Sequence, residues 1–516
     1  MQPFAGPIFA AIAALVLWEL AAQALAGSYL LAGPVAVFNH VLAEAPLLGR
    51  ALGTTFHSAA LGYFWGNFAA IVLAAFALLL PPSEQPIRIL SLVVFCLPII
   101  AIGPILRVLF GPGIGPQVTL SALGVFYTTL VPLLAGLRAT PQVWLDLVES
   151  YGRGGWTALW HVRLMAAMPY LVAGLQIAAP AAFLGAMIGE FTGAERGMGV
   201  LALRAMRSLD VEATWTLAAM AAVVSILAYV AAGLLGRLLW PGAPPVLLVA
   251  PVASRSQKPG RPLLVALALG PVVLLIWHGA LEFFELNSFF AKRPGDIWSF
   301  LVGGGASAEH RSVLLAALRE TVASAGPGYL AGLGAGALLA GLCMLVPRMA
   351  RALLPIAVTL RAVPIVTTAP LIVLMLGRGA AGVVTIVAVM IFFPTLVACL
   401  HGLRRAPQPV LDVFESYAAD RWQILINARV PAALPAFFAS ARMTVPAAVL
   451  AATVAEWLAT GKGIGNLMAL SASTSDYNML WSSVLLLTLV AVAAHAVIAL
   501  GERAVFLRYA PEQMRR

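Results

Sequence analysis

The sequence predicts an all-α membrane protein of about twelve transmembrane helices, arranged as two parallel six-helix repeats. Of its 516 residues, 61% are hydrophobic and only 10% are charged, whereas a soluble domain carries about 25% charged residues. Apolar stretches of about 20 residues, the length that crosses a hydrocarbon core, recur along the chain. The second half of the sequence also matches the first in one fixed register.

Six candidate spans lie in each half of the chain. They cover residues 7–27, 55–80, 87–109, 117–137, 169–191 and 213–239, and then 263–284, 322–346, 352–376, 382–403, 435–457 and 479–501. The first stretch lacks a basic region before it and is long enough to span, so we expect a retained helix and not a cleaved signal peptide. Between the halves, a proline-rich segment reads as a linker. We therefore expect one domain at 1–239, a linker at 240–262 and a second domain at 263–516.

The internal repeat has a single register, the shift that carries Trp156 onto Trp422. Prolines, tryptophans and acids all keep this register, and the same shift carries Glu190 onto Glu456. Similar apolar composition could align leucines by chance, but it would not align these rarer residues in one register. Because each copy holds an even number of spans, the two copies are parallel and related by an axis along the membrane normal.

The basic residues predict the orientation of the chain in the membrane. The connectors on the side of the termini and the linker hold 18 Lys and Arg residues, and the opposite connectors hold 10. Cytoplasmic loops carry the excess of positive charge, so both termini and the linker are expected in the cytoplasm. This bias also accounts for the net charge of +10 without a nucleic-acid partner.

The longest cytoplasmic connector of each half, at 138–169 and 404–435, contains a short amphipathic helix. After Thr140 as N-cap and Pro141 as first residue, the apolar residues Trp144, Leu145, Val148 and Tyr151 share one face, with acids on the other. A helix that rests on lipid headgroups is one interpretation. Such helices are usually rich in Lys and Arg, so the acidic face favours docking onto another protein.

These connectors resemble the EAA loop of ABC importer permeases, and the chain as a whole is similar to the nitrate, sulfonate and taurine branch of that family. The similarity rests on Asp412 to Pro435, on Arg361-Ala362-Val363-Pro364, and on Glu456 followed by Gly463-Ile464-Gly465. The resemblance implies a type I ABC importer permease, here with two permease domains fused in tandem, in a bacterial inner membrane. It also implies two copies of a cytoplasmic ATPase subunit, a periplasmic solute-binding protein and a small anionic solute.

The resemblance assigns coupling to the ATPase to one helix in each loop. The expected residues are Asp146, Glu149, Tyr151, Gly152, Asp412, Glu415, Tyr417 and Ala418. Two departures from the family pattern are the aspartates at 146 and 412 in place of glutamate, and Ala418 where the first copy keeps Gly152. Whether the two coupling helices contribute equally stays open.

Three charged residues inside the predicted spans are candidates for the translocation pathway: Glu190, Arg361 and Glu456. An ionisable group in a membrane is costly and therefore a functional candidate. For the two glutamates the alternative is that each caps a loop or pairs with a neighbour. For Arg361 the alternatives are an ion pair with an acid such as Glu456 or a place facing the pathway.

The sequence carries no phosphate-binding loop of the G-x-x-x-x-G-K-[ST] type, so we expect no ATP site in this chain and no cofactor. The cysteines and histidines lack metal or redox spacing, and no catalytic cluster supports a membrane enzyme. The competing function is a secondary transporter with two parallel six-helix halves driven by an ion gradient. A secondary transporter does not require acidic amphipathic helices in these loops.

Overall fold

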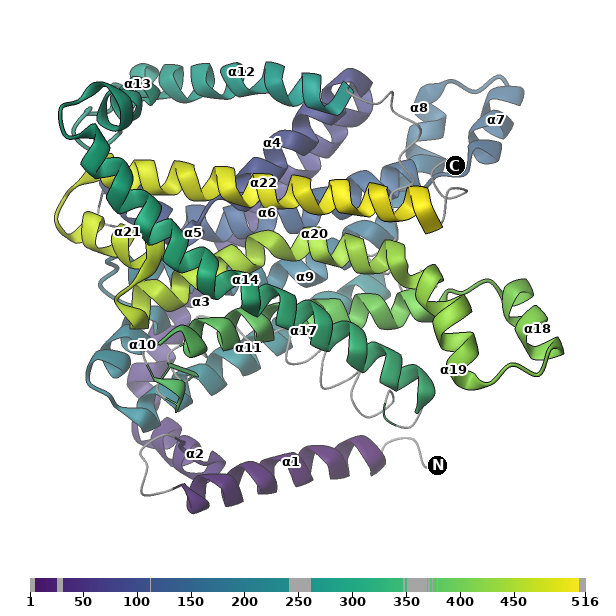
Figure 1. The fold of residues 1–516 in the computed structure, drawn as a ribbon, viewed down its shortest axis with the longest axis horizontal. Helices are drawn as coiled ribbons and strands as arrows, with labels where there is room; N and C mark the ends of the chain where they lie inside the picture. The colour runs from purple at the N-terminus through teal and green to yellow at the C-terminus, as the bar shows by residue number, and fades with distance from the viewer. Residues whose placement is uncertain are drawn as a thin grey trace.

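The chain forms a bundle of long helices that lie side by side (Figure 1). The computed structural model describes residues 5–25, 31–240 apart from 112, 261–346 and 379–509, with a few positions between 349 and 377. Within these ranges the regular structure is entirely helical. The predicted all-α class is therefore confirmed.

Helices overlap eleven of the twelve predicted spans. In the first half they are α1 (Ala5–Ala24), α3 (Ala45–Leu79), α4 (Glu84–Cys96), α5 (Ile99–Phe110), α6 (Gly115–Arg138), α9 (Leu164–Phe191) and α11 (Val211–Leu239). In the second half they are α12 (Arg261–Phe283), α14 (Ser307–Leu345), α17 (Ala380–Arg404), α20 (Val430–Ala455) and α22 (Tyr477–Tyr509). In the described part of the chain, eight helices are long and apolar enough to cross a membrane, or nine if α4 and α5 count as one span. The predicted span at 352–376 falls largely outside the described residues.

Shorter helices connect the long ones at both ends of the bundle. They are α2 (Pro34–Ala43), α7 (Gln142–Ser150), α8 (Gly155–Ala158), α10 (Met198–Arg207), α13 (Pro294–Trp298), α18 (Gln408–Ser416), α19 (Arg421–Ile424) and α21 (Gly463–Ser473). Figure 1 places α7, α8, α18 and α19 at one end and α10, α13 and α21 at the other.

The third predicted span, 87–109, is not one straight helix. It divides into α4 and α5, which are bent by 92° relative to each other. The bend lies at Leu97 and Pro98, where Leu97 adopts an extended backbone conformation. Proline donates no backbone hydrogen bond and disfavours helical geometry in the residue before it, so the helix ends at Cys96 and restarts after Pro98.

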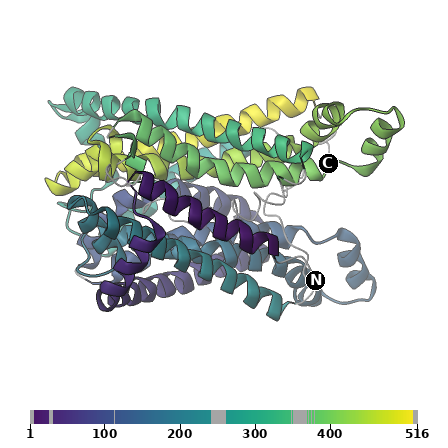
Figure 2. The ribbon, with the colours of Figure 1, turned by 90° about the horizontal axis from the view of Figure 1, so that it is seen from below.

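This broken span packs against the other half of the chain. Cys96 at the end of α4 shares one apolar cluster with Val445 of α20 and Ala491 of α22. Ala101 in α5 shares another with Ile464 and Leu480. The halves, which lie one above the other in Figure 2, thus meet along a span that bends between them.

The sequence repeat is reproduced in side-chain contacts. The Tyr63 hydroxyl donates to the backbone oxygen of Leu175 at 3.1 Å, and the Tyr329 hydroxyl donates to that of Ala441 at 2.6 Å. In the repeat register, Tyr329 is the equivalent of Tyr63, and Ala441 is the equivalent of Leu175. Equivalent helices in the two halves therefore pack in the same way, which confirms the internal repeat.

A buried glutamate anchors the short helix α10 to the spans beneath it. Glu190 is only 2% exposed. One of its carboxyl oxygens accepts a hydrogen bond from the Thr55 hydroxyl at 2.7 Å, and the other accepts from the Gly199 amide at 2.6 Å. Thr55 in turn accepts from the Met198 amide at 2.8 Å. Because the first amides of a helix have no partner within it, these side chains satisfy the start of α10. We call Glu190, Thr55 and the two amides the outer clamp.

The second half contains the same outer clamp around α21. The Thr321 hydroxyl and the Gly465 amide both donate to Glu456 at 2.9 Å, and the Ile464 amide donates to Thr321 at 2.8 Å. This copy has one additional acceptor: the Glu320 carboxyl group accepts a hydrogen bond from the Gly463 amide at 2.9 Å. Glu456 is 3% exposed, so both clamps are closed off from solvent.

Glycine is required at the entry to each clamped helix. Gly197 has φ +134° and Gly463 has φ +85°, a region that other residues rarely adopt. A Cβ atom at either position would lie within 2.3 Å of the carboxyl carbon of the clamping glutamate. The glycines that the sequence shares between the repeats are thus explained by the close approach of the acid.

Thr55→Val is expected to destabilise the protein by about 1–3 kcal/mol, because it removes the donor to Glu190 and the acceptor of the Met198 amide in a buried place. The matched control is Thr54→Val, since the exposed Thr54 hydroxyl bonds to the Arg50 carbonyl of its own helix. Thermal unfolding of the two purified variants in detergent provides the measurement. Equal midpoints would show that the clamp does not hold α10.

Candidate functional site

The helices α7 and α18 protrude together from one end of the bundle (Figures 1 and 2). They occupy equivalent places in the repeat, because their first residues, Gln142 and Gln408, correspond in its register. The start of α1 and the last turn of α22 lie at this same end, which Figure 1 shows on the right. The two predicted amphipathic helices thus lie apart from each other at the same end of the bundle, and we call their exposed faces together the docking surface.

The predicted start of the first docking helix is wrong in one detail. Pro141 is the N-cap and α7 begins at Gln142, without a side-chain cap. The Thr140 hydroxyl donates instead to the Leu137 carbonyl at 3.4 Å, so it closes the end of α6. Proline at the N-cap fits this geometry, because its extended backbone precedes the helix.

The apolar side chains of the docking helices divide between an inner and an outer direction. In α18, Leu411 is buried in a cluster with Ala406 and Ala428, and Phe414 packs against them. In α7 the equivalent residues, Leu145 and Val148, are half-buried. In α18, Leu411 and Phe414 fix the helix to its own loop. The predicted apolar face of α7 is thus covered unevenly: Leu145 and Val148 are half-buried, whereas Trp144 and Tyr151 are exposed.

The outer direction leaves large apolar side chains uncovered. Trp144 on α7 is 57% exposed, and Tyr151 and Tyr417, which directly follow α7 and α18, are 76% and 84% exposed. Leu147 and its repeat equivalent Val413 are also exposed. Contiguous exposed apolar side chains mark contact surfaces in proteins. Since both helices present them at the same end, the docking surface is suited to a partner that touches both halves.

The acids of the docking helices lie beside these apolar side chains. Gln142 donates to Asp146 at 3.1 Å, and Gln408 donates to Asp412 at 2.8 Å. The carboxylates at 146 and 412 therefore hold the first turn of each helix. Glu149 and Glu415 are exposed on the last turn, where their charge faces outward.

Each docking helix ends in a residue with left-handed backbone conformation. Gly152 has φ +66° and Ala418 has φ +52°. Their amides bond back to the carbonyls of Glu149 and Glu415 at 2.9 and 3.0 Å, as at many helix ends. The second copy therefore keeps the turn although it lacks the glycine that this conformation favours.

The structure describes two of the three pathway candidates. Glu190 and Glu456 are the acids of the outer clamps, at the end of the bundle away from the docking surface. Both are buried and hydrogen-bonded, which favours the capping interpretation over direct contact with solute in this conformation. Arg361 lies outside the described residues.

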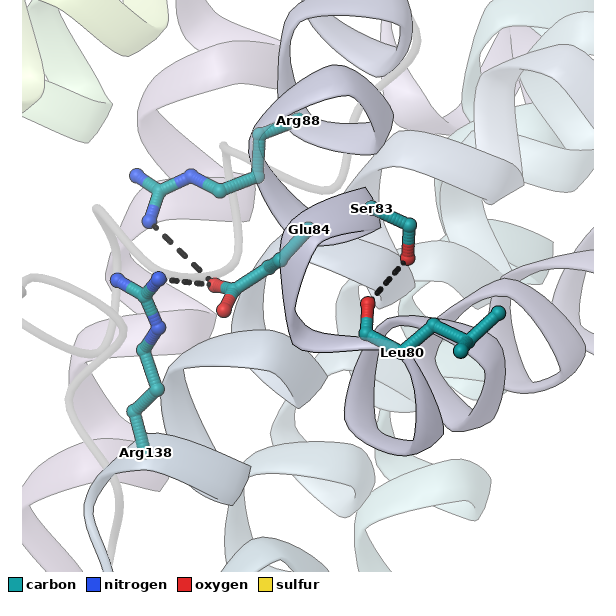
Figure 3. A network of polar contacts seen from close by, with 5 residues as sticks. All are labelled: Leu80, Ser83, Glu84, Arg88 and Arg138. Carbon is teal, nitrogen blue, oxygen red and sulfur yellow. Dashed lines mark hydrogen bonds and ion pairs between the residues drawn. The ribbon is translucent and has the colours of Figure 1, made fainter. Parts of the chain in front are cut away.

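Two features were not found by sequence reasoning. Thr55 and Thr321 match in the repeat, and this signal could have identified them as partners of the glutamates. The second is the ion-pair network of Glu84, Arg88 and Arg138 (Figure 3). The second copy does not repeat its acid in the sequence, so the repeat gives no signal for it.

Within the described ranges, no group of three or more His, Cys, Asp or Glu side chains could hold a metal ion.

Comparison with known proteins finds one family twice along the chain. The family described as "Binding-protein-dependent transport system inner membrane component" matches residues 66–242 and 332–507. One segment lies in each half of the chain. No solved structure matches significantly.

Several curated proteins are similar to parts of the chain. A probable ABC transporter permease protein of Haemophilus influenzae is 29% identical over 233 residues, which is 45% of this chain and 93% of the relative. The riboflavin transport system permease protein RibX of Chloroflexus aurantiacus is 29% identical over 30% of this chain and 57% of its own. The taurine transport system permease protein TauC of Escherichia coli is 30% identical over 26% of this chain and 47% of its own.

The chain is thus about twice as long as the segment that the Haemophilus influenzae relative matches, and that relative corresponds to one repeat. Two family matches, the repeated helix order and the multiple apolar helices lead to one conclusion. The chain belongs to the inner membrane components of binding-protein-dependent ABC transport systems, with two permease units fused in tandem.

Proposed function

We propose that this chain forms the translocation pathway of a bacterial ABC importer for a small anionic solute, with its docking surface on two copies of a cytoplasmic ATPase subunit. The observation that carries the proposal is the pair of equivalent helices whose large apolar side chains are exposed at one end of the bundle. A single lipid-facing helix would not need an equivalent at the same end. Two identical subunits would need two such surfaces.

The orientation follows from the same arrangement. The docking surface shares its end of the bundle with the start of α1 and the last turn of α22, and the basic bias favours the cytoplasm for that end. The opposite end, with α10 and α21, then faces the periplasm and a solute-binding protein. We further propose domain boundaries at 1–239 and 263–516, with a cytoplasmic linker between them.

The solute class is supported by relatives and not by a described site. Proteins named for aliphatic sulfonates in Bacillus subtilis and for taurine in Escherichia coli are among the similar sequences. Others are named for riboflavin and formylaminopyrimidine. Sulfonates are anions, and Arg361 in the predicted ninth span is the residue of this chain that we propose to attract them.

The mechanism follows from the geometry of the two ends. ATPase subunits that close on ATP would draw α7 and α18 together, and the two halves would rotate about their common interface. The outer clamps would keep α10 and α21 fixed to their own halves during this movement. Solute released by the binding protein would then pass between the halves, while ATP hydrolysis takes place on the partner subunits.

Reversing the charge at both docking helices tests the assembly. The double variant Glu149→Lys with Glu415→Lys is expected to weaken co-purification of the ATPase by about tenfold or more. A partner surface that complements the two acids would repel lysines in their place. Glu212→Lys is the matched control, since Glu212 is exposed at the opposite end, in the first turn of α11. Unchanged retention of the ATPase in the double variant would argue against docking through these helices.

The energy source for uptake, ATP or an ion gradient, distinguishes the proposed importer from a secondary transporter. In proteoliposomes that contain the chain, its ATPase and its binding protein, uptake is expected to require enclosed ATP and to persist when a protonophore and ionophores remove all ion gradients. Uptake that needs a gradient and proceeds without ATP would support the secondary transporter instead.

The residue after each docking helix should respond in opposite ways to substitution. Gly152→Ala places a side chain in a left-handed conformation and is expected to destabilise the first loop by about 1 kcal/mol. Ala418→Gly relieves the same conformation in the second loop. Hydrogen exchange of the amides at 148–153 and 414–419 should therefore quicken in the first variant and slow in the second. A change in the same direction in both would contradict the assigned backbone.

A further inference from the structure

An ion pair joins the base of the first docking helix to the start of α4. The Nη2 atom of Arg138, the last residue of α6, lies 2.5 Å from Oε1 of Glu84, the first residue of α4 (Figure 3). Arg88, one turn along α4, reaches the same oxygen at 4.0 Å. The Glu84 side chain is only 17% exposed. The Arg138 side chain is 41% exposed, and the pair sets the position of the end of α6 relative to the start of α4.

The position of Arg138 places this pair next to the docking surface. Only Ala139, Thr140 and Pro141 separate it from α7. Pro141 and the bond from Thr140 to Leu137 leave this connection short and restrained. A displacement of α7 would therefore act on the end of α6 and on the guanidinium of Arg138.

The other end of the pair leads to the second half of the chain. On α4, Cys96 and Leu92 pack against Val445 of α20 and Ala491 of α22. Leu92 is one turn beyond Arg88, so the charged end and the packed end belong to one short helix. Since α4 is separated from α5 by the bend at Pro98, it is a short helix of its own between α6 and the second half.

The repeat makes this connection unequal. The repeat equivalents of Glu84, Arg88 and Arg138 are, in that order, Ala350, Leu354 and Arg404. The second copy thus keeps the arginine at the base of its docking helix and lacks the acid. An ion pair of this kind is specified by the sequence in the first half alone.

We infer that Glu84 and Arg138 are positioning residues for coupling, and that their ion pair carries the movement of α7 through α4 into the opposite half. The inference rests on the proposed docking of α7 to an ATPase. It means that the two docking helices are not equivalent. The first acts on the opposite half through the ion pair of Glu84 and Arg138, which we call the strut. The second acts on its own half through apolar packing around Leu411.

The strut can be tested without a known solute. Spin labels at Leu90→Cys on α4 and Leu489→Cys on α22, both exposed side chains, report the distance between α4 and the second half. The three native cysteines are buried. In the purified complex of the chain with its ATPase, ATP plus vanadate is expected to shift this distance. Arg138→Gln and Glu84→Gln should each reduce the shift by about threefold or more.

Matched variants separate a positioning role from a merely structural one. Arg404→Gln removes the repeat-equivalent arginine and should leave the shift unchanged. Arg138→Lys retains a cation and should restore most of it. The double variant Glu84→Gln with Arg138→Gln should be no worse than either single one, because both substitutions remove the same interaction. All variants should retain the ATPase on co-purification.

The outcomes are distinct. An equal shift in Arg138→Gln and in the unsubstituted protein, with the ATPase retained, would overturn the strut and leave the docking proposal intact. An equal loss in Arg404→Gln and Arg138→Gln would overturn the inequality of the two halves. Failure of the unsubstituted chain to retain any ATPase would overturn the proposed docking, and the strut with it.

Discussion

The interaction on which the outer end of this structure depends is the buried carboxyl group that receives the first amides of a short helix. In a lipid environment there is no water to satisfy such amides, so each must find a partner within the protein. Glu190 with Thr55, and Glu456 with Thr321, provide these partners. Each clamp ties three segments of one half together: the second span, the fifth span and the short helix that follows the fifth.

The clamps also explain why acids occur where the bilayer makes them costly. The carboxyl group of each glutamate lies at the N-terminal end of α10 or α21, where the positive end of the helix dipole favours a negative group. The neighbouring glycines allow the backbone to approach the carboxyl group closely. The two pathway candidates Glu190 and Glu456 thus have hydrogen-bond partners in the folded chain. Loss of either clamp would leave buried polar groups unpaired.

The sequence predicted the helical class, the repeat and the two docking helices, because each depends on a local or periodic pattern. Apolar length identified the spans, and the single repeat register identified the equivalent positions. The bend between α4 and α5 was missed although Pro98 was visible, since a proline within a span can kink a helix or end it. The uneven covering of the apolar face of α7 was not predicted, because periodicity does not tell which side chains the neighbouring segments cover. The network of Glu84 and Arg138 depends on tertiary contact between α4 and α6, and its acid has no repeat equivalent.

The halves are alike in their packing and unlike in their charges. The same tyrosine bonds and the same clamps occur in both, which keeps the core geometry equivalent. The charged contacts differ: Glu84 pairs with Arg138 in the first half, and Arg442 pairs with Glu502 in the second. Fusion of the two units into one chain allows such differences, because each half always meets the other and never a copy of itself.

Site-specific cross-linking tests the central claim most directly. Cysteines introduced at Leu147 and at its repeat equivalent Val413, both exposed on the docking surface, should each form a cross-link to the ATPase subunit in membranes. A cysteine at Leu315, exposed near the start of α14 at the opposite end of the bundle, should form none. Cross-links from both docking positions would support an ATPase-coupled permease with two docking helices. Their absence from both, in membranes where the ATPase is present, would contradict it.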